Sequence, residues 1–143
     1  NPYDRAYSDY LWLQKDRKIK GSFKDYITKS GKFKQVLTNN SVKAYRGDHL
    51  WQQTDFFDFK QMDFIGRFEN LSKDINQLKN KLHIHKGFNH HSKRSDNRKS
   101  HYSLFYNKQK KRLVEAYFKK DIELLDYTFT DKRSGSYKLK KWV

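Results

Sequence analysis

The chain contains no cysteine and no long apolar segment. The absence of cysteine excludes a disulfide framework, a thiol nucleophile and zinc sites built from cysteine. No apolar run approaches the roughly 20 residues that a helix needs to cross a bilayer, so we expect no membrane-spanning segment. The chain also begins without methionine or the apolar region of a signal peptide. We therefore expect a piece cut from a longer protein.

Acidic residues are scarce beside basic ones: 16 aspartates and glutamates face 32 lysines and arginines, which gives a net charge of +16. This excess favours anionic partners, such as nucleic acid, a phosphorylated cofactor, an acidic polysaccharide or anionic lipid. A solvated lysine-rich surface would give the same composition, so charge alone does not choose the ligand. Aromatic residues make up 17% of the 143 residues, enough to supply much of one domain's core.

Apolar side chains recur at three- and four-residue spacings in several segments, which predicts helices. The predicted helices cover residues 2–14, 22–28, 33–37, 71–82 and 108–125. Asn1, Ser22 and Asn107 are residue types that cap a helix start, and each directly precedes or begins one of these segments. Pro2 suits the first helical position because its missing N–H costs nothing there.

One compact apolar segment, residues 62–69, has the character of a strand rather than a helix. Its sequence Met-Asp-Phe-Ile-Gly-Arg-Phe-Glu predicts a buried strand in which Gly66 lets another backbone come close. Arg67 and Glu69 in such a strand are expected to satisfy each other or nearby backbone rather than to act in catalysis.

A polar stretch from His83 to about Arg98 predicts a solvated loop. It holds four histidines, His83, His85, His90 and His91. Since no cysteine or convergent carboxylate joins them, we expect no metal site there. The basic residues Lys93, Arg94 and Arg98 are candidates to contact a nucleotide phosphate or an acidic sugar chain, a hypothesis that rests on charge and loop placement.

The first helix carries the most informative pattern. Ser8 lies two turns in, on the side away from the stripe that contains Ala6 and Leu13. A hydroxyl in that place can donate to an anion held against the helix, and Arg5 lies one turn nearer the positive helix end. On its own, a serine on a basic helix is usually an ordinary surface residue.

The same residues closely resemble the 3′-phosphate-binding motif of sulfotransferases, Arg-(Asp/Asn)-Pro-x-x-Arg-x-x-Ser-x-Tyr. The matching residues are Asn1, Pro2, Arg5, Ser8 and Tyr10. In that motif the serine and a leading arginine hold the 3′-phosphate of 3′-phosphoadenosine 5′-phosphosulfate (PAPS), the activated sulfate donor. The arginine would precede Asn1. The resemblance implies PAPS as cofactor, with Ser8 and Arg5 in its binding site.

Further segments resemble the same family in the same order along the chain. They are residues 49–56, 63–74, 88–92 and 102–129. The first is similar to a "His…Pro-Gln-Thr-Asp" segment, with Gln52 where proline is usual, and the second to the pattern D-x-I-G-R-F-E-N-L-x-x-D. The third resembles a "hydrophobic-Asn-x-Ser" loop, and the last resembles the family's closing helix.

The resemblance is to the branch that modifies carbohydrates, including heparan sulfate and chondroitin sulfotransferases. It implies an α/β, P-loop-like fold, of which this chain would be a mostly helical C-terminal fragment with one or two sheet strands. Residues 1–129 would belong to the sulfotransferase domain, and residues 130–143 would form a basic tail. The implied function is transfer of a sulfuryl group from PAPS to a hydroxyl of a carbohydrate acceptor, which could itself be acidic.

The family's lysine-bearing phosphosulfate loop and its catalytic base lie upstream of the 3′-phosphate motif. Neither has a counterpart here, so we expect the chain alone to be incomplete and inactive, with its base unknown. The alternatives are a basic nucleic-acid-binding module and a non-catalytic binder of sulfated polysaccharide. No nucleic-acid-binding motif supports the first, so nucleic acid is not an expected partner. The location, Golgi lumen or cytoplasm, would depend on the source.

Overall fold

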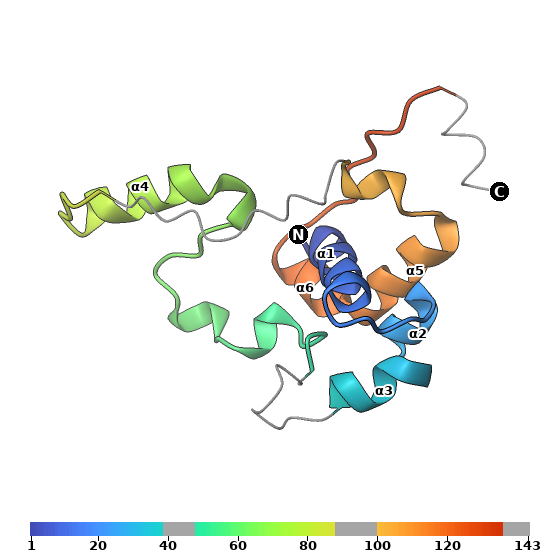
Figure 1. Cartoon of the computed structure of the whole chain (residues 1–143). Coiled ribbons are helices and arrows are strands. Elements are labelled where there is room, and N and C mark those ends of the chain that lie inside the picture. Colours follow the sequence, from blue (N-terminus) through green and yellow to red (C-terminus); the bar gives the residue numbers. More distant parts are fainter. Residues whose placement is uncertain (39–47, 88–99, 136–143) are drawn as a thin grey trace. The chain divides into compact units, whose positions relative to one another are not determined.

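The structure is a computed structural model that describes residues 1–38, 48–87 and 100–135 (Figure 1). Every regular element in these ranges is a helix or a 3₁₀ turn. The chain divides into two compact units. Unit 1 comprises residues 1–56 and 101–143, and unit 2 comprises residues 57–100.

Unit 1 contains five α-helices and two 3₁₀ turns in its described part. They are α1 (Pro2–Lys15), α2 (Phe23–Ile27), α3 (Gly31–Thr38), η2 (Gln53–Asp55), η5 (Tyr102–Leu104), α5 (Lys108–Tyr117) and α6 (Lys119–Leu124). The three predicted caps are confirmed. Asn1 Oδ1 accepts from the Tyr3 N–H at 3.0 Å, and Asn107 Oδ1 accepts from the Lys110 N–H at 2.9 Å. Ser22 forms a reciprocal capping box with Asp25.

The core of unit 1 is built largely from aromatic rings. Helix α1 buries Tyr3, Ala6, Tyr10 and Leu13. The other buried members include Phe23, Tyr26, Phe33, Leu37, Leu50, Tyr102, Tyr106, Val114 and Phe118. Ring pairs meet edge to face, as for Tyr10 and Phe23 at 5.3 Å and 86°, an arrangement that the ring quadrupoles favour. The buried hydroxyl of Tyr106 donates to the Tyr3 carbonyl at 2.8 Å, so the rings are held by polar contacts as well.

The last predicted helix is broken in the structure. The segment 108–125 forms α5 and α6, which meet at Phe118 with φ −99° and ψ 28°. The buried side chains Val114, Phe118, Asp121 and Leu125 continue along one face across this break. The apolar spacing is thus unchanged by the break, which is why the sequence predicted a single helix.

After α6, residues 127–133 form a segment that we call the C-terminal strap, which packs back onto unit 1. The Thr130 N–H donates to the Tyr102 hydroxyl at 2.9 Å, and Arg133 Nη1 donates to the Tyr106 carbonyl at 3.2 Å. Arg133 is buried and pairs with Asp131. The start of the basic C-terminal stretch is therefore part of the packed unit.

Unit 2 contains α4 (Leu71–Lys81) and the turns η3 (Phe59–Gln61) and η4 (Phe68–Asn70). Helix α4 follows the predicted segment 71–82 but buries none of its residues fully. Asp74 in the first turn of α4 holds the preceding segment, because its Oδ2 accepts from the Arg67 N–H at 2.6 Å. No helix in the described ranges combines the length and apolar character needed to cross a bilayer.

The predicted α/β fold is wrong for this chain, because residues 1–38, 48–87 and 100–135 contain no strand and no sheet. Residues 62–69 form an irregular segment leading into η4, and it is exposed: Phe68 is 83% exposed and Met62 43%. A strand needs a neighbour to satisfy its backbone groups, and the described residues offer none. A Cβ at Gly66 would make ordinary contacts, and the nearest atoms it meets belong to the side chains of Phe64 and Asp74 rather than to another backbone.

Candidate functional site

Ser8 lies on the outer face of α1, as the spacing predicted. Its side chain is exposed, whereas Ala6 and Tyr10 on either side of it in sequence are buried. The first-turn N–H groups of α1 are already used, since Asn1 Oδ1 accepts from both Tyr3 and Asp4. An anion near Ser8 would therefore be held by side chains and not by the helix terminus.

Arg5 joins three segments of unit 1. Its Nη2 donates to the His49 carbonyl at 2.8 Å, and its Nη1 lies 3.9 Å from Oδ2 of Asp121. The guanidinium carbon is 5.7 Å from the ring centroid of Phe118, within reach of a cation–π contact. Arg5 thus connects α1, residues 49–55 and α6, although its buried Nη1 forms no hydrogen bond and has only the 3.9 Å ion pair with Asp121.

His49 is fixed against α1 and α2 by a chain of hydrogen bonds. Its Nδ1 lies 2.9 Å from Oδ1 of Asp9, whose Oδ2 accepts from the Tyr26 hydroxyl at 2.8 Å. Burial, reinforced by Asp9, raises the pKa of Tyr26 well above its usual value, so its hydroxyl stays a donor. The His49 ring also packs against Trp12, with centroids 5.6 Å apart.

Asp121 anchors the segment that follows His49. Its fully buried carboxylate accepts from the Gln53 N–H at 2.8 Å, from the Thr54 N–H at 2.9 Å and from the Thr54 hydroxyl at 2.8 Å. Charge-assisted hydrogen bonds of this kind are about twice as strong as neutral ones. In the sequence alone, Asp121 is most simply a helix and packing residue. The one signal of its role was an acidic residue on an otherwise apolar helix face.

The structure brings together some of the segments named by the resemblance. Helix α1, residues 49–55 and α6 meet around Arg5. Residues 63–74 belong to unit 2. The candidate residues Lys93, Arg94 and Arg98, together with His90 and His91, lie outside the described residues.

The remaining histidines of the predicted loop, His83 and His85, are exposed after the end of α4. In the parts of the chain that the structure describes, no group of three or more histidine, aspartate or glutamate residues could hold a metal ion. The site thus consists of an exposed hydroxyl at Ser8 on the same helix as Arg5, whose guanidinium contacts His49 and Asp121.

Comparisons with models of protein families, with curated proteins and with solved structures found no match to this chain. The resemblance to sulfotransferases therefore stays a prediction from the residues. The contribution of the structure is their placement, with Ser8 exposed on a helix whose next turn back carries Arg5.

Proposed function

We propose that the protein takes part in transfer of a sulfuryl group from PAPS to a hydroxyl of a carbohydrate, with Ser8 contacting the 3′-phosphate of the donor. The observation that carries this proposal is the exposed hydroxyl of Ser8 on α1, within the run that resembles the 3′-phosphate motif. It is supported by the junction at Arg5, where two further segments of the resemblance contact the same helix.

In this proposal Ser8 and Arg5 have different roles. The Ser8 hydroxyl donates a hydrogen bond to a phosphate oxygen, which is a charge-assisted contact. Arg5 acts as a positioning residue, because its guanidinium already binds the His49 carbonyl and faces Asp121. PAPS, when bound, supplies the sulfuryl group.

Sulfuryl transfer also needs a base that takes the proton of the attacking hydroxyl and cationic groups around the sulfuryl oxygens. The proposal assigns neither to a described residue. Lys93, Arg94 and Arg98 remain the candidates for contacts with phosphate or with an acidic acceptor.

The test measures retention of the full 143-residue chain on immobilised 3′,5′-ADP, which is the nucleotide that PAPS becomes once its sulfuryl group has been transferred. We expect retention that persists in moderate salt and elution by free 3′,5′-ADP. Ser8→Ala should weaken binding by about ten- to a hundredfold, since one hydrogen bond to a charged group contributes about 1.5 to 3 kcal/mol. The matched control is Ser72→Ala, which removes an exposed serine hydroxyl from α4 and should leave binding unchanged.

Three results would overturn the proposal. Equal binding of 3′,5′-ADP by the parent chain and Ser8→Ala would remove Ser8 from the site. Steeply salt-dependent DNA binding without retention on 3′,5′-ADP would favour a nucleic-acid-binding module. Retention on sulfated polysaccharide alone would favour a non-catalytic glycan binder.

A further inference from the structure

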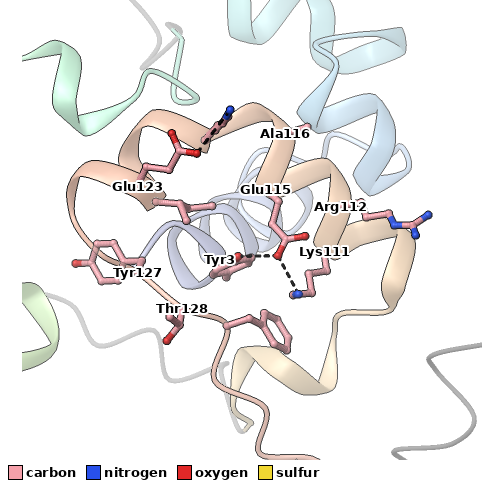
Figure 2. Close-up of a pocket in the computed structure, with 11 residues that line it drawn as sticks. Tyr3, Lys111, Arg112, Glu115, Ala116, Glu123, Tyr127 and Thr128 are labelled. Carbon is pink, nitrogen blue, oxygen red and sulfur yellow. Dashed lines mark hydrogen bonds and ion pairs between the residues drawn. The ribbon is translucent and has the colours of Figure 1, made fainter.

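Unit 1 contains a cavity of about 680 Å³ on a side of α1 that the site above does not use. Its walls come from Tyr3 in the first turn of α1, from α5, from α6 and from the C-terminal strap (Figure 2). Its size falls in the range typical of small-ligand sites, roughly 300 to 1,000 Å³.

The polar groups of the cavity form one small network and one ion pair. Glu115 Oε1 accepts from the Tyr3 hydroxyl at 3.2 Å and lies 2.9 Å from Lys111 Nζ, as Figure 2 shows. One turn further on, Lys119 Nζ lies 3.6 Å from Glu123 Oε1. Burial and the neighbouring Glu115 raise the pKa of Tyr3, so its phenol remains a protonated donor.

Most of these charges are paired, which sets the cavity apart from the rest of a strongly basic chain. Lys111 is paired with Glu115 and Lys119 with Glu123, and Arg112 adds a single further cation. A site for phosphate or sulfate groups usually carries a surplus of cations, whereas two of the three cations here are paired with carboxylates. Ammonium groups only donate and carboxylates only accept, so their alternation suits hydroxyl groups, which do both.

Aromatic and apolar side chains complete the cavity. Tyr127 and Phe129 of the strap line it together with Ile122 of α6. Phe129 is fixed edge-on against Tyr3, with ring centroids 5.1 Å apart at 83°. The Tyr127 N–H donates to the Ile122 carbonyl at 2.9 Å, which holds the start of the strap against α6. Such rings can pack against the C–H face of a sugar ring, because their electron-rich faces attract its weakly positive hydrogens.

We propose that this cavity binds a neutral sugar residue of a carbohydrate chain. Tyr3 and Ser8 are five residues apart on α1, which places them about 140° apart around the helix. A sugar in the cavity is therefore not at the proposed 3′-phosphate contact, and the cavity is an accessory sugar subsite. The inference goes beyond the proposed function and does not depend on it, because sugar binding needs no sulfate donor.

In the experiment, the full chain is titrated with neutral hexasaccharides of glucose, galactose, mannose and N-acetylglucosamine. Binding is measured by saturation-transfer NMR at low salt and again in about 0.3 M salt. We expect at least one of them to bind with little dependence on salt. Tyr127→Ala should weaken that binding about tenfold or more. Trp51→Ala, which removes another exposed aromatic ring of unit 1, is the matched control and should leave it unchanged.

A second variant guards against loss of folding in Tyr127→Ala. Ala116→Arg places a long side chain into the cavity from the exposed face of α5 and removes no core group, so it should abolish binding. The inference would be overturned if none of the four hexasaccharides bound. It would also be overturned if both variants bound the sugar as tightly as the parent chain does. Ser8→Ala should not change sugar binding, and Tyr127→Ala should not change 3′,5′-ADP binding, so each proposal can fail separately.

Discussion

Units 1 and 2 show how similar helical patterns lead to different packing. Helix α1 of unit 1 buries Tyr3, Ala6, Tyr10 and Leu13 among other aromatic rings. Helix α4 of unit 2 carries an equally regular apolar face but buries none of its residues fully. The large apolar side chains that stay exposed in unit 2 are Met62, Ile65, Phe68, Leu71, Leu82 and Ile84. Apolar spacing thus predicts that a segment is helical, and it does not predict how deeply the helix is buried.

Polar contacts of unit 1 also join residues farther apart in the sequence than those of unit 2 do. In unit 1 the buried carboxylate of Asp121 binds backbone and side-chain groups 67 and 68 positions away. In unit 2 the hydrogen bond between Arg67 and Asp74 spans seven positions. Long-range polar anchors fix the tertiary structure of unit 1, whereas the hydrogen bond between Arg67 and Asp74 in unit 2 fixes only the segment that leads into α4.

The largest expected effect is that of Asp121→Ala. Removal of the carboxylate leaves the Gln53 and Thr54 N–H groups without their partner and takes away the ion-pair partner of Arg5. We expect the free energy of unfolding to fall by about 3 to 5 kcal/mol in a denaturant titration. The control Asp58→Ala removes an exposed carboxylate of unit 2 and should cost less than about 1 kcal/mol. Equal losses in the two variants would contradict the distinction between the units.

The second prediction makes the same substitution in both units. Leu37→Ala removes a fully buried side chain from unit 1 and should lower the free energy of unfolding by about 2 to 5 kcal/mol. Leu82→Ala acts on a side chain that is 58% exposed in unit 2 and should change it by less than about 0.5 kcal/mol. Thermal or denaturant unfolding measures both. A loss above 2 kcal/mol for Leu82→Ala would show that α4 packs more tightly than described.

The third prediction concerns alkaline pH. The pKa of Tyr26 is raised in the folded state by burial and then by Asp9, so the unfolded chain loses its phenolic proton first. The stability that the protonated phenol contributes is complete below about pH 10, the usual pKa of tyrosine, and is lost as the pH rises further. In Tyr26→Phe, the free energy of unfolding should therefore fall less steeply with rising pH between about pH 9 and pH 11.5. An unchanged slope would show that Tyr26 does not couple folding to pH.

The smallest expected effect lies at the exposed start of α2. Hydrogen bonds from the Ser22 side chain, then from its backbone, lower the pKa of Asp25 in the folded state. The resulting stability is present above the usual pKa of aspartate, about 4, and is lost as the pH falls through the folded value. Asp25→Asn and Ser22→Ala should each flatten the fall in melting temperature between about pH 5 and pH 2. If the melting temperature of both variants fell as much as that of the parent chain over this pH range, this role of the capping box would be contradicted.

Features set by neighbouring residues could be predicted from the sequence. Asn1, Ser22 and Asn107 cap helices because a short polar side chain can reach the N–H groups two or three positions ahead. The outward direction of Ser8 followed from the helical period alone. The helix caps and the direction of Ser8 both depend on residues within about two helical turns, so the local sequence is enough to predict them.

Features that depend on distant partners could not be predicted. Residues 62–69 have the composition of a buried strand, yet a strand forms only where a second strand pairs with it. The break at Phe118 has no local cause such as proline or glycine, and it accompanies the docking of Asp121 onto Gln53 and Thr54. Likewise, the sequence did not show that Arg5 would be engaged by His49, because the two residues lie 44 positions apart.

The contacts of Tyr3 also have a consequence for the time course of folding during synthesis. Its carbonyl accepts from Tyr106 and its hydroxyl donates to Glu115, which lie 103 and 112 positions later. At about 5 to 20 residues per second, a ribosome adds these partners roughly 5 to 20 s after Tyr3 itself. During that interval the aromatic face of α1 lacks the rings of Tyr102, Phe105 and Tyr106 that cover it. The nascent chain therefore passes through a stage in which the apolar side of residues 2–15 is exposed and lacks part of the core that covers it in the folded unit.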